Sequence, residues 1–236
     1  MNMDVSDKNI PQNEIKYKFN KYASNYDKSR KQLIPCFTEF YGTVIKIIPF
    51  SHSESISILD IGAGTGLLTE LIAKKFINAQ ITLIDISAEM LSIAQERLKQ
   101  YKGISFQVGD YSKSFTVQKY KLIVSSLSIH HLCDNDKKKL FEKIQNCLEP
   151  NGIFINADQV LGESNEIEKI YQRNWLEEVT HNGVTDKALT EALDRMKEDK
   201  MAPLSKQLKW LEQCGFSEVN CWYKNYRFAV YSATNK

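Results

Sequence analysis

The stretch that decides the fold is SILDIGAGTG, residues 57–66. Its first half is a short apolar run, and glycine stands at positions 62, 64 and 66. A short apolar run that ends at glycines is typical of a buried β-strand followed by a tight turn. Glycine permits positive φ and lets a ligand approach the backbone closely. The stretch therefore predicts a strand, a ligand-binding loop and a helix N-terminus that favours a negatively charged group.

Strand and helix signals alternate on the C-terminal side of this loop. Strands are expected at residues 57–61, 80–84, 104–108, 120–125 and 153–157, and helices at 67–76, 88–98 and 136–148. This alternation predicts an α/β fold, with a parallel sheet and helices on both faces. On the N-terminal side, helical spacing is visible at residues 14–26 and 33–48, and Pro49 ends the second segment.

The alternation stops after Asp158. Residues 163–211 are charged and helical in pattern, and two strand signals follow at 217–223 and 226–232. We therefore expect four parts: N-terminal helices that contribute to a cap (1–50), a ligand-binding core (51–160), a helical cap insertion (161–212) and a terminal β-hairpin that completes the sheet (213–236). A helical insertion between sheet strands is a natural lid over a binding site.

The glycine loop does not fit the dinucleotide-binding pattern G-x-G-x-x-G. Counted from Gly62, the third glycine of that pattern would fall at position 67, which is Leu67. A nicotinamide-dependent dehydrogenase is therefore disfavoured. The pattern that is present is D-x-G-x-G-x-G, which begins at Asp60.

Three acidic residues, Asp60, Asp85 and Asp110, stand at the ends of three successive predicted strands. The carboxyl ends of parallel strands border the crevice in which open α/β sheets bind ligands. A carboxylate at Asp85 can accept two hydrogen bonds from a ribose diol. Taken singly, Asp85 could instead cap the helix that follows Ser87, and Asp110 could be a solvated turn residue. Their joint occurrence favours the binding site.

These motifs resemble the class I S-adenosylmethionine-dependent methyltransferases. The resemblance covers residues 56–158, including KLIVSSLSIHHL at 121–132 and LEPNG at 148–152. It implies a Rossmann-like seven-stranded sheet of order 3-2-1-4-5-7-6 with strand 7 antiparallel. It also implies S-adenosylmethionine as the cofactor, with Asp60 near its amino-acid part and Asp110 at its adenine amino group. The cofactor-binding residues implied are Asp60, Gly62, Ala63, Gly64, Gly66, Asp85, Ile86, Asp110, Tyr111 and Ser126.

The flanking segments resemble a narrower subgroup that includes carboxy-S-adenosylmethionine synthase, an enzyme of tRNA wobble modification. The resemblance lies in Phe19, Tyr22, Ala23, Tyr26, Asp27, Pro35, Arg195, the segment QCGF at 213–216 and the aromatic stretch 222–228. The loop after the first strand, however, is that of an ordinary methyltransferase. We therefore expect methyl transfer to an oxygen, nitrogen or carbon centre of a small molecule. The alternatives are a tRNA-modification enzyme related to the synthase and a non-catalytic cofactor-binding protein.

Two candidate catalytic residues, His130 and His131, follow the fourth predicted strand. A neutral imidazole there could serve as general base, and His130 is the preferred candidate. The alternative is that one histidine packs under the cap while the other bonds to the backbone. No metal site is expected, because no further ligands stand near the pair in the sequence.

Other residues offer weaker signals. Tyr22, Tyr26, Tyr171 and Trp175 could line an acceptor pocket or simply pack, and Arg30 could pair with a cofactor carboxylate or be a surface cation. The run of lysines at 137–139 reads as a solvated helix face.

Composition bounds the class of protein. The chain has 236 residues, of which 42% are hydrophobic and 25% charged, with a formal net charge of +2. This composition is typical of a globular protein. The small net charge disfavours a nucleic-acid partner but does not exclude one. The five cysteines lack disulfide or zinc spacing, and residues 1–12 lack the apolar core of a signal peptide. We expect a cytoplasmic enzyme with no membrane partner, and a homodimer stays open.

Overall fold

The computed structural model describes residues 30–113 and 118–236. The strands are β1 (Ser57–Ile61), β2 (Gln80–Asp85), β3 (Ile104–Val108), β4 (Tyr120–Ser126), β5 (Leu148–Gln159), β6 (Ser217–Asn225) and β7 (Phe228–Thr234). The helices are α2 (Phe37–Ile47), α3 (Leu67–Lys75), α4 (Ala88–Leu98), α5 (Asp134–Cys147), α6 (Asn165–His181), α7 (Asp186–Met196) and α8 (Leu204–Gln213), with a short 3₁₀ turn η1 (Ile129–His131). No helix among these residues has the length and apolar character needed to cross a membrane.

All seven strands join one sheet in the order β3-β2-β1-β4-β5-β7-β6. Strands β1 to β5 pair in parallel, and β7 pairs antiparallel with both β5 and β6. The order and the antiparallel β7 implied by the methyltransferase resemblance are confirmed. Ile61 at the end of β1 is in register with Ile84 of β2 and Ser125 of β4, so these three strands finish at one level. The loops that follow them therefore meet at one edge of the sheet.

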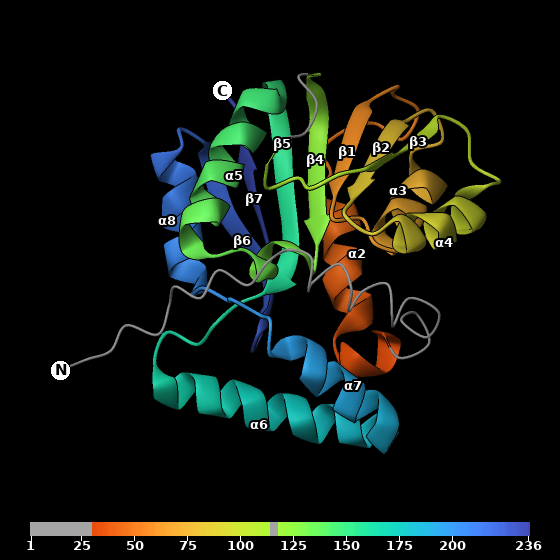
Figure 1. Cartoon of the computed structure of the whole chain (residues 1–236). Helices are drawn as coiled ribbons and strands as arrows, with labels where there is room; N and C mark the ends of the chain where they lie inside the picture. The colour runs from red at the N-terminus through yellow and green to blue at the C-terminus, as the bar shows by residue number, and fades with distance from the viewer. Residues whose placement is uncertain (1–29, 114–117) are drawn as a thin grey trace.

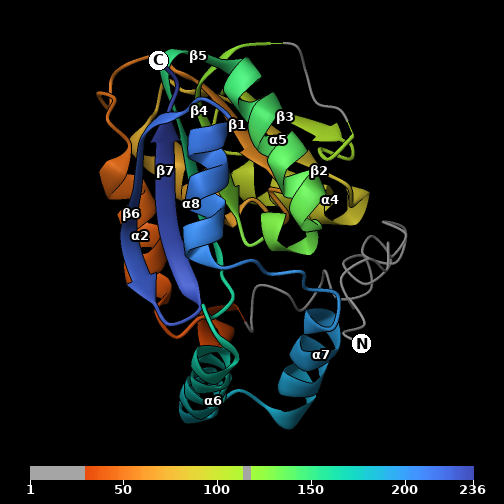
Figure 2. The same ribbon diagram turned by 90° about the vertical axis from the view of Figure 1, so that its left-hand side faces the viewer.

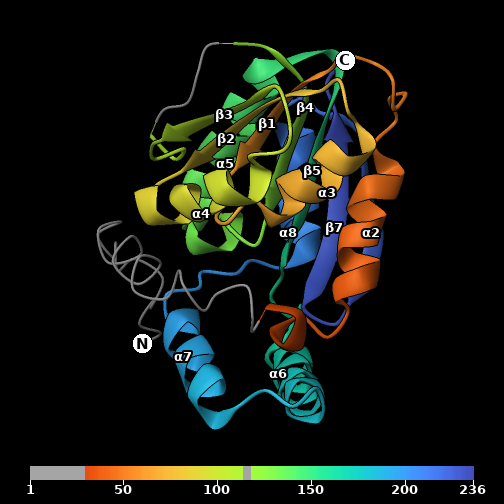
Figure 3. The same cartoon turned by 90° about the vertical axis from the view of Figure 1, so that its right-hand side faces the viewer.

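Helices cover both faces of the sheet, as expected. Figure 3 shows α2, α3 and α4 on one face, and Figure 2 shows α5 and α8 on the other. Each face has its own apolar core: Phe40, Ile72 and Leu91 belong to the first, and Phe141 and Trp210 to the second. Buried apolar side chains of this kind supply the main stabilising term of the fold.

Helices α6 and α7 form a separate layer beyond the end of the sheet. Figure 1 shows them below the end toward which β4 points. The chain reaches this layer after β5 and returns from it to α8. Helices α6 and α7 therefore occupy the position of a cap over the carboxyl ends of the parallel strands.

Two expectations about the cap differ from the structure. Helix α8 was expected within it, but Leu204, Trp210 and Leu211 of α8 are buried in the core beside the sheet. Helix α2 was expected to begin at residue 33 and to contribute to the cap, but it begins at Phe37 and packs on the sheet. Pro35 explains the later start, because proline lacks an N–H and disfavours helical geometry in the residue before it. The expected helix at 14–26 lies outside the described residues.

Candidate active site

The glycine loop runs from the end of β1 to the first turn of α3. Gly62, Gly64 and Gly66 have φ values of 65°, 54° and 74°, in the left-handed region that favours glycine. A Cβ on Gly62 would lie 1.9 Å from Oγ of Ser128, so the loop packs closely against the segment after β4. A Cβ on Gly64 would meet no atom of residues 30–113 or 118–236 within 4 Å. The loop is therefore closed by protein at Gly62 and open at Gly64.

Asp60 lies behind this loop and is 1% exposed. Its Oδ2 accepts a hydrogen bond from the Thr69 hydroxyl at 2.6 Å, whereas its Oδ1 is buried and has no hydrogen-bond partner among the residues that the structure describes. Burial raises the pKa of Asp60 to about 7, although the Thr69 bond opposes the shift. An unsatisfied buried carboxylate oxygen fits a site that receives a cationic or hydrogen-bond-donating group.

Asp85 ends β2 and binds two backbone amides at once. Its Oδ2 accepts from the N–H of Gly64 and its Oδ1 from the N–H of Ser87, both at 2.8 Å. Ser87 in turn caps α4, because its hydroxyl accepts from the N–H of Met90 at 3.0 Å. Asp85 thus fixes the glycine loop and the start of α4, and the backbone N–H of Ile86 also bonds to its carboxyl group.

Asp110 and Tyr111 follow β3. One oxygen of Asp110 accepts from the backbone N–H and the hydroxyl of Ser112, at 3.0 and 2.6 Å, which closes a turn. The Tyr111 hydroxyl shares a hydrogen bond with Oγ of Ser128 at 2.7 Å. This bond joins the end of β3 to the segment after β4.

These segments enclose a cavity, here called the loop cavity, with about 620 Å³ of space free of protein atoms. Of the residues expected at the cofactor, those that line it are Gly62, Gly64, Asp85, Ile86, Asp110, Tyr111 and Ser126. Asp60, Ala63 and Gly66 do not line it. Ala63 and Gly66 shape the loop through a backbone hydrogen bond of 2.9 Å from the Gly66 N–H to the Ala63 carbonyl.

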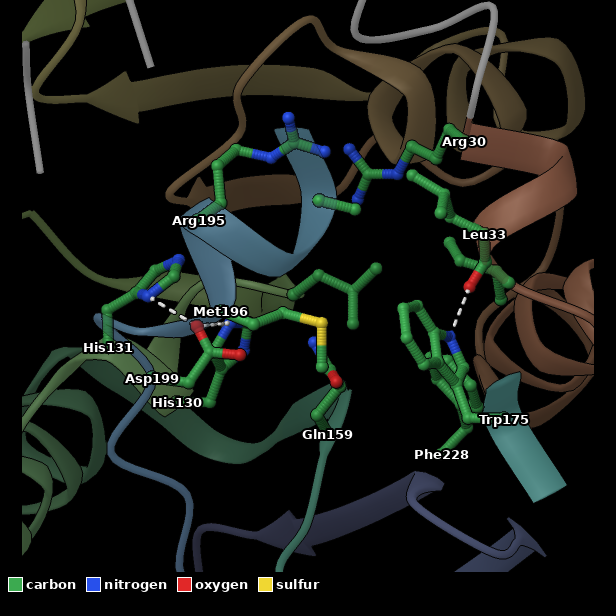
Figure 4. A pocket seen from close by; sticks show the side chains of 13 residues that line it. Arg30, Leu33, His130, His131, Gln159, Trp175, Arg195, Met196, Asp199 and Phe228 are labelled. Atoms are coloured by element: carbon green, nitrogen blue, oxygen red, sulfur yellow. Dashed lines mark hydrogen bonds and ion pairs between the residues drawn. The ribbon is translucent and has the colours of Figure 1, made fainter. Parts of the chain in front are cut away.

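A second cavity of about 640 Å³, here called the cap cavity, lies under α6 and α7. Figure 4 shows its wall, to which Trp175 of α6, Arg195 and Met196 of α7, and Asp199 contribute. Three residues line both cavities: Arg30, Leu127 and His131. The two cavities therefore adjoin. Leu127, at their boundary, holds a φ of 49°, a strained value for leucine of the kind found at functional sites.

His130 is held between two carboxylates. Its Nδ1 lies 2.5 Å from Oδ1 of Asp158, and its Nε2 lies 3.4 Å from Oδ1 of Asp199. Burial lowers the pKa of His130, but the two carboxylates outweigh burial and raise the pKa to about 10. Both ring nitrogens of His130 face carboxylates, and this geometry with the raised pKa disfavours the neutral general base that we expected at His130.

His131 has the opposite electrostatic setting. Burial and the charge of His130 lower the pKa of His131, although Asp199 lies 3.3 Å from its Nδ1. Its ring lies at the boundary between the cavities. The lowered pKa favours the uncharged form of the imidazole at His131 rather than at His130.

Of the aromatic and arginine residues that could line an acceptor pocket, some line the cap cavity and others do not. Trp175 lines the cap cavity, and its Nε1–H donates to the Leu33 carbonyl at 3.0 Å, whereas Tyr171 lies outside the cavity against Lys224. Arg30 lines both cavities and is not a plain surface cation. The side chains of Arg30 and Arg195 both reach the cap cavity, as Figure 4 shows. Tyr22 and Tyr26 lie outside the described residues.

Sequence reasoning missed Asp158, Asp199 and Lys137. Lys137 is fully buried, and its ammonium group donates to the carbonyls of Leu132 and Lys200. Burial lowers its pKa to about 8. The lysine run at 137–139 is therefore not a uniformly solvated face. The carboxyl end of β5 could have pointed to Asp158, but no local pattern marks Asp199.

Comparison with known proteins agrees with this geometry. Residues 58–152, less than half of the chain, match a family model described as a methyltransferase domain. A malonyl-[acyl-carrier protein] O-methyltransferase of Neorickettsia risticii is 41% identical over 113 residues, which cover 48% of this chain and 43% of that protein. A carboxy-S-adenosyl-L-methionine synthase of Nautilia profundicola is 23% identical over 214 residues, which cover 89% of this chain and 91% of that protein.

The fold matches as well. Haemonchus contortus phosphoethanolamine N-methyltransferase 2, solved in complex with S-adenosyl-L-methionine, superposes with a TM-score of 0.62 at 16% identity, over 84% of this chain and 52% of that chain. The chain spans about half the length of the first two curated relatives that it matches, 54% and 43%.

Sheet order, glycine loop and family match define a class I S-adenosylmethionine-dependent methyltransferase fold, with the methyltransferase domain at residues 58–152. The cofactor of this class is S-adenosylmethionine. The residues present fit it, because the loop is open at Gly64, and Asp85 and the unsatisfied Asp60 offer acceptors nearby.

Proposed function

We propose that this chain transfers the methyl group of S-adenosylmethionine to a small molecule that occupies the cap cavity. The observation that carries the proposal is that the two cavities adjoin. Arg30, Leu127 and His131 line both of them. Methyl transfer is an in-line displacement and needs the acceptor directly beside the methyl donor. Two adjoining cavities, one with cofactor-binding groups and one beneath a cap, meet that requirement.

The cofactor would lie in the loop cavity. S-adenosylmethionine supplies an electrophilic methyl group on a sulfonium, so the protein mainly aligns the acceptor. Asp85 would hold the ribose, and Asp110 and Tyr111 would border the adenine. The glycine loop and Asp60 would face the amino-acid part. Ile86 and Ser126 would complete the wall.

The acceptor would carry an anionic group. Arg30 and Arg195 bring two guanidinium groups to a cavity whose wall also contains apolar side chains, among them Leu33, Trp175, Met196 and Phe228. Arginine binds carboxylates and phosphates through paired N–H donors. Two relatives are named malonyl-[acyl-carrier protein] O-methyltransferases, and malonyl is an acidic acyl group. A small carboxylic acid is the substrate class that this cavity favours.

The test begins with binding and ends with turnover. Calorimetry should detect S-adenosylmethionine and its demethylated product, and should not detect NAD. Methyl transfer from labelled cofactor to a panel of small carboxylic acids should then identify acceptors. Arg195→Gln should raise KM for the acceptor by about 10–100-fold, as expected for the loss of a charged hydrogen bond, and should leave cofactor affinity unchanged.

Arg173→Gln is the matched control, because Arg173 is an exposed arginine of the cap helix α6. Binding of NAD without S-adenosylmethionine would reject the proposal, as would methyl transfer that is equally sensitive to both arginine substitutions.

The second candidate is a carboxy-S-adenosylmethionine synthase activity. It is favoured by the match to the Nautilia profundicola synthase over 89% of this chain. The two candidates differ in which molecule is changed. Mass spectrometry after incubation with acidic metabolites would find a methylated acceptor in the first case and a heavier cofactor in the second.

A further inference from the structure

Two histidines and an aspartate converge in the wall of the cap cavity. One potential ligand atom from each of His130, His131 and Asp199 lies within 4.8 Å of the other two. The Asp199 oxygen lies 3.4 Å from the His130 nitrogen and 3.3 Å from the His131 nitrogen. In a tetrahedral zinc site with bonds of about 2.0–2.2 Å, neighbouring ligand atoms lie about 3.3–3.6 Å apart. The two distances match that spacing.

An outer carboxylate orients the first of these ligands. Asp158 faces Nδ1 of His130 at 2.5 Å and also accepts from the backbone N–H of His130 at 3.0 Å. A histidine ligand of a metal ion usually donates its other ring N–H to a carboxylate, which fixes the ring and its tautomer. With Nδ1–H donated to Asp158, the Nε2 lone pair is directed to the cluster.

One carboxylate oxygen of Asp199 has no hydrogen-bond partner among the described residues, which indicates that a ligand binds there. Its side chain is only 5% exposed, and its Oδ2 is buried without a hydrogen-bond partner. A buried carboxylate oxygen with no partner is costly, so such an atom calls for a bound cation or donor. Asp199 lines the cap cavity together with both histidines.

The two segments that supply the ligands are fastened to each other. The N–H of Lys200, next to Asp199, donates to the carbonyl of His130 at 2.8 Å. The buried ammonium group of Lys137 donates to the carbonyls of Leu132 and Lys200, one on each segment. The backbone therefore holds the aspartate against the histidine pair in the way a preorganised site requires.

We propose that His130, His131 and Asp199 bind a divalent first-row transition-metal ion, represented by Zn²⁺, with a coordination position open to the cap cavity. Two imidazoles and one carboxylate favour ions of this kind over Mg²⁺ or Ca²⁺, which prefer oxygen ligands. Catalytic zinc sites have three protein ligands and leave the fourth position for water or substrate. Metal binding replaces the proton that His130 holds between the carboxylates, and this proton passes to solvent.

The ion would also hold an acceptor oxygen at the boundary of the two cavities, a consequence that rests on the proposed methyl transfer. A metal ion lowers the pKa of a bound hydroxyl and orients it. His131, which lines both cavities, places the ion near the point where they meet. The site itself requires neither cofactor nor acceptor, so it can be tested without turnover.

The experiment uses the full chain, stripped with a chelator and titrated with Zn²⁺ in a calorimeter. Wild type should bind one ion per chain. Asp199→Asn and His131→Ala should each weaken binding by at least about 100-fold, and Asp158→Asn should weaken it by about 10–100-fold through the outer carboxylate. His181→Ala is the control, because His181 is an exposed histidine at the end of α6.

Three further measurements distinguish loss of the metal site from loss of the fold. The visible absorption of the Co²⁺-substituted protein should show the strong bands of tetrahedral coordination and lose them in Asp199→Asn. Circular dichroism and binding of the demethylated cofactor should confirm that each variant is folded. Absence of stoichiometric Zn²⁺ binding by wild type would overturn the proposal. Equal loss in His181→Ala, or wild-type affinity in Asp199→Asn, would overturn it as well.

Discussion

Asp85 accepts a hydrogen bond from the backbone N–H of Gly64, with 2.8 Å between Oδ2 and N. The carboxylate that we propose holds the ribose is thus the same one that fixes the glycine loop and, through Ser87, the start of α4. Cofactor binding and local loop structure are coupled through one side chain.

We predict that Asp85→Ala weakens S-adenosylmethionine binding by about 1.5–3 kcal/mol, the usual range for a charged hydrogen-bond partner. It should also lower the thermal midpoint, because the amides of Gly64 and Ser87 lose their acceptor. Calorimetry and thermal unfolding measure the two effects. Asp110→Ala is the comparison and should weaken binding less, since a single amino contact is expected there. Unchanged affinity in Asp85→Ala would mean that Asp85 only organises the loop and the helix.

The glycine loop offers a matched pair of substitutions. Gly62→Ala should unfold or strongly destabilise the chain, because its Cβ would lie 1.9 Å from Oγ of Ser128. Gly64→Ala should stay folded at a cost of about 1–2 kcal/mol for the left-handed backbone, because its Cβ meets no protein atom within 4 Å. It should nevertheless lose cofactor binding, and Gly64→Val should do so completely. Normal cofactor affinity in a folded Gly64→Val would place the cofactor away from this loop.

The raised pKa of Asp60 predicts a pH effect on stability. Its pKa is about 7 in the fold against 3.8 for the ordinary carboxyl, so the folded state holds the proton more tightly. The contribution of Asp60 to stability is therefore largest below about pH 4 and is lost as pH rises to about 7. Asp60→Asn cannot ionise, so its stability relative to wild type should increase between pH 5 and pH 8. Chemical unfolding at these two pH values is the measurement. A difference that does not change with pH would indicate an ordinary pKa.

The cap should be the most mobile of the described helical layers. Among the side chains of α7, Ala192 alone is buried, and α6 buries Tyr171, Trp175 and Val179. Few buried contacts imply a low free energy of local opening. Amide hydrogen exchange in α6 and α7 should therefore be fast without ligand and slower with the demethylated cofactor and an acceptor. Helix α8, packed on the sheet, should be protected in both states. Equal protection of α7 and α8 without ligand would rule out a mobile cap.

The sequence by itself determined the sheet core and the loop cavity. Each strand of the parallel half ends in a local signal, such as the glycines after Ile61 or the acids at Asp85 and Asp110. Parallel strands bring such ends to one edge whatever follows in the chain. Local pattern was therefore sufficient to place Gly62, Gly64, Asp85 and Asp110 at one cavity.

Only the tertiary structure decided the chemistry of the cap side. Asp199 meets His130 because the chain leaves β5, passes through α6 and α7 and returns to the sheet, a path that no spacing in the sequence records. The same packing buries Lys137 while its neighbour Lys139 stays exposed. It also places His130 between Asp158 and Asp199, whose carboxylates raise its pKa. Charge state depends on desolvation and on neighbours in space, and for these residues the neighbours come from distant parts of the chain.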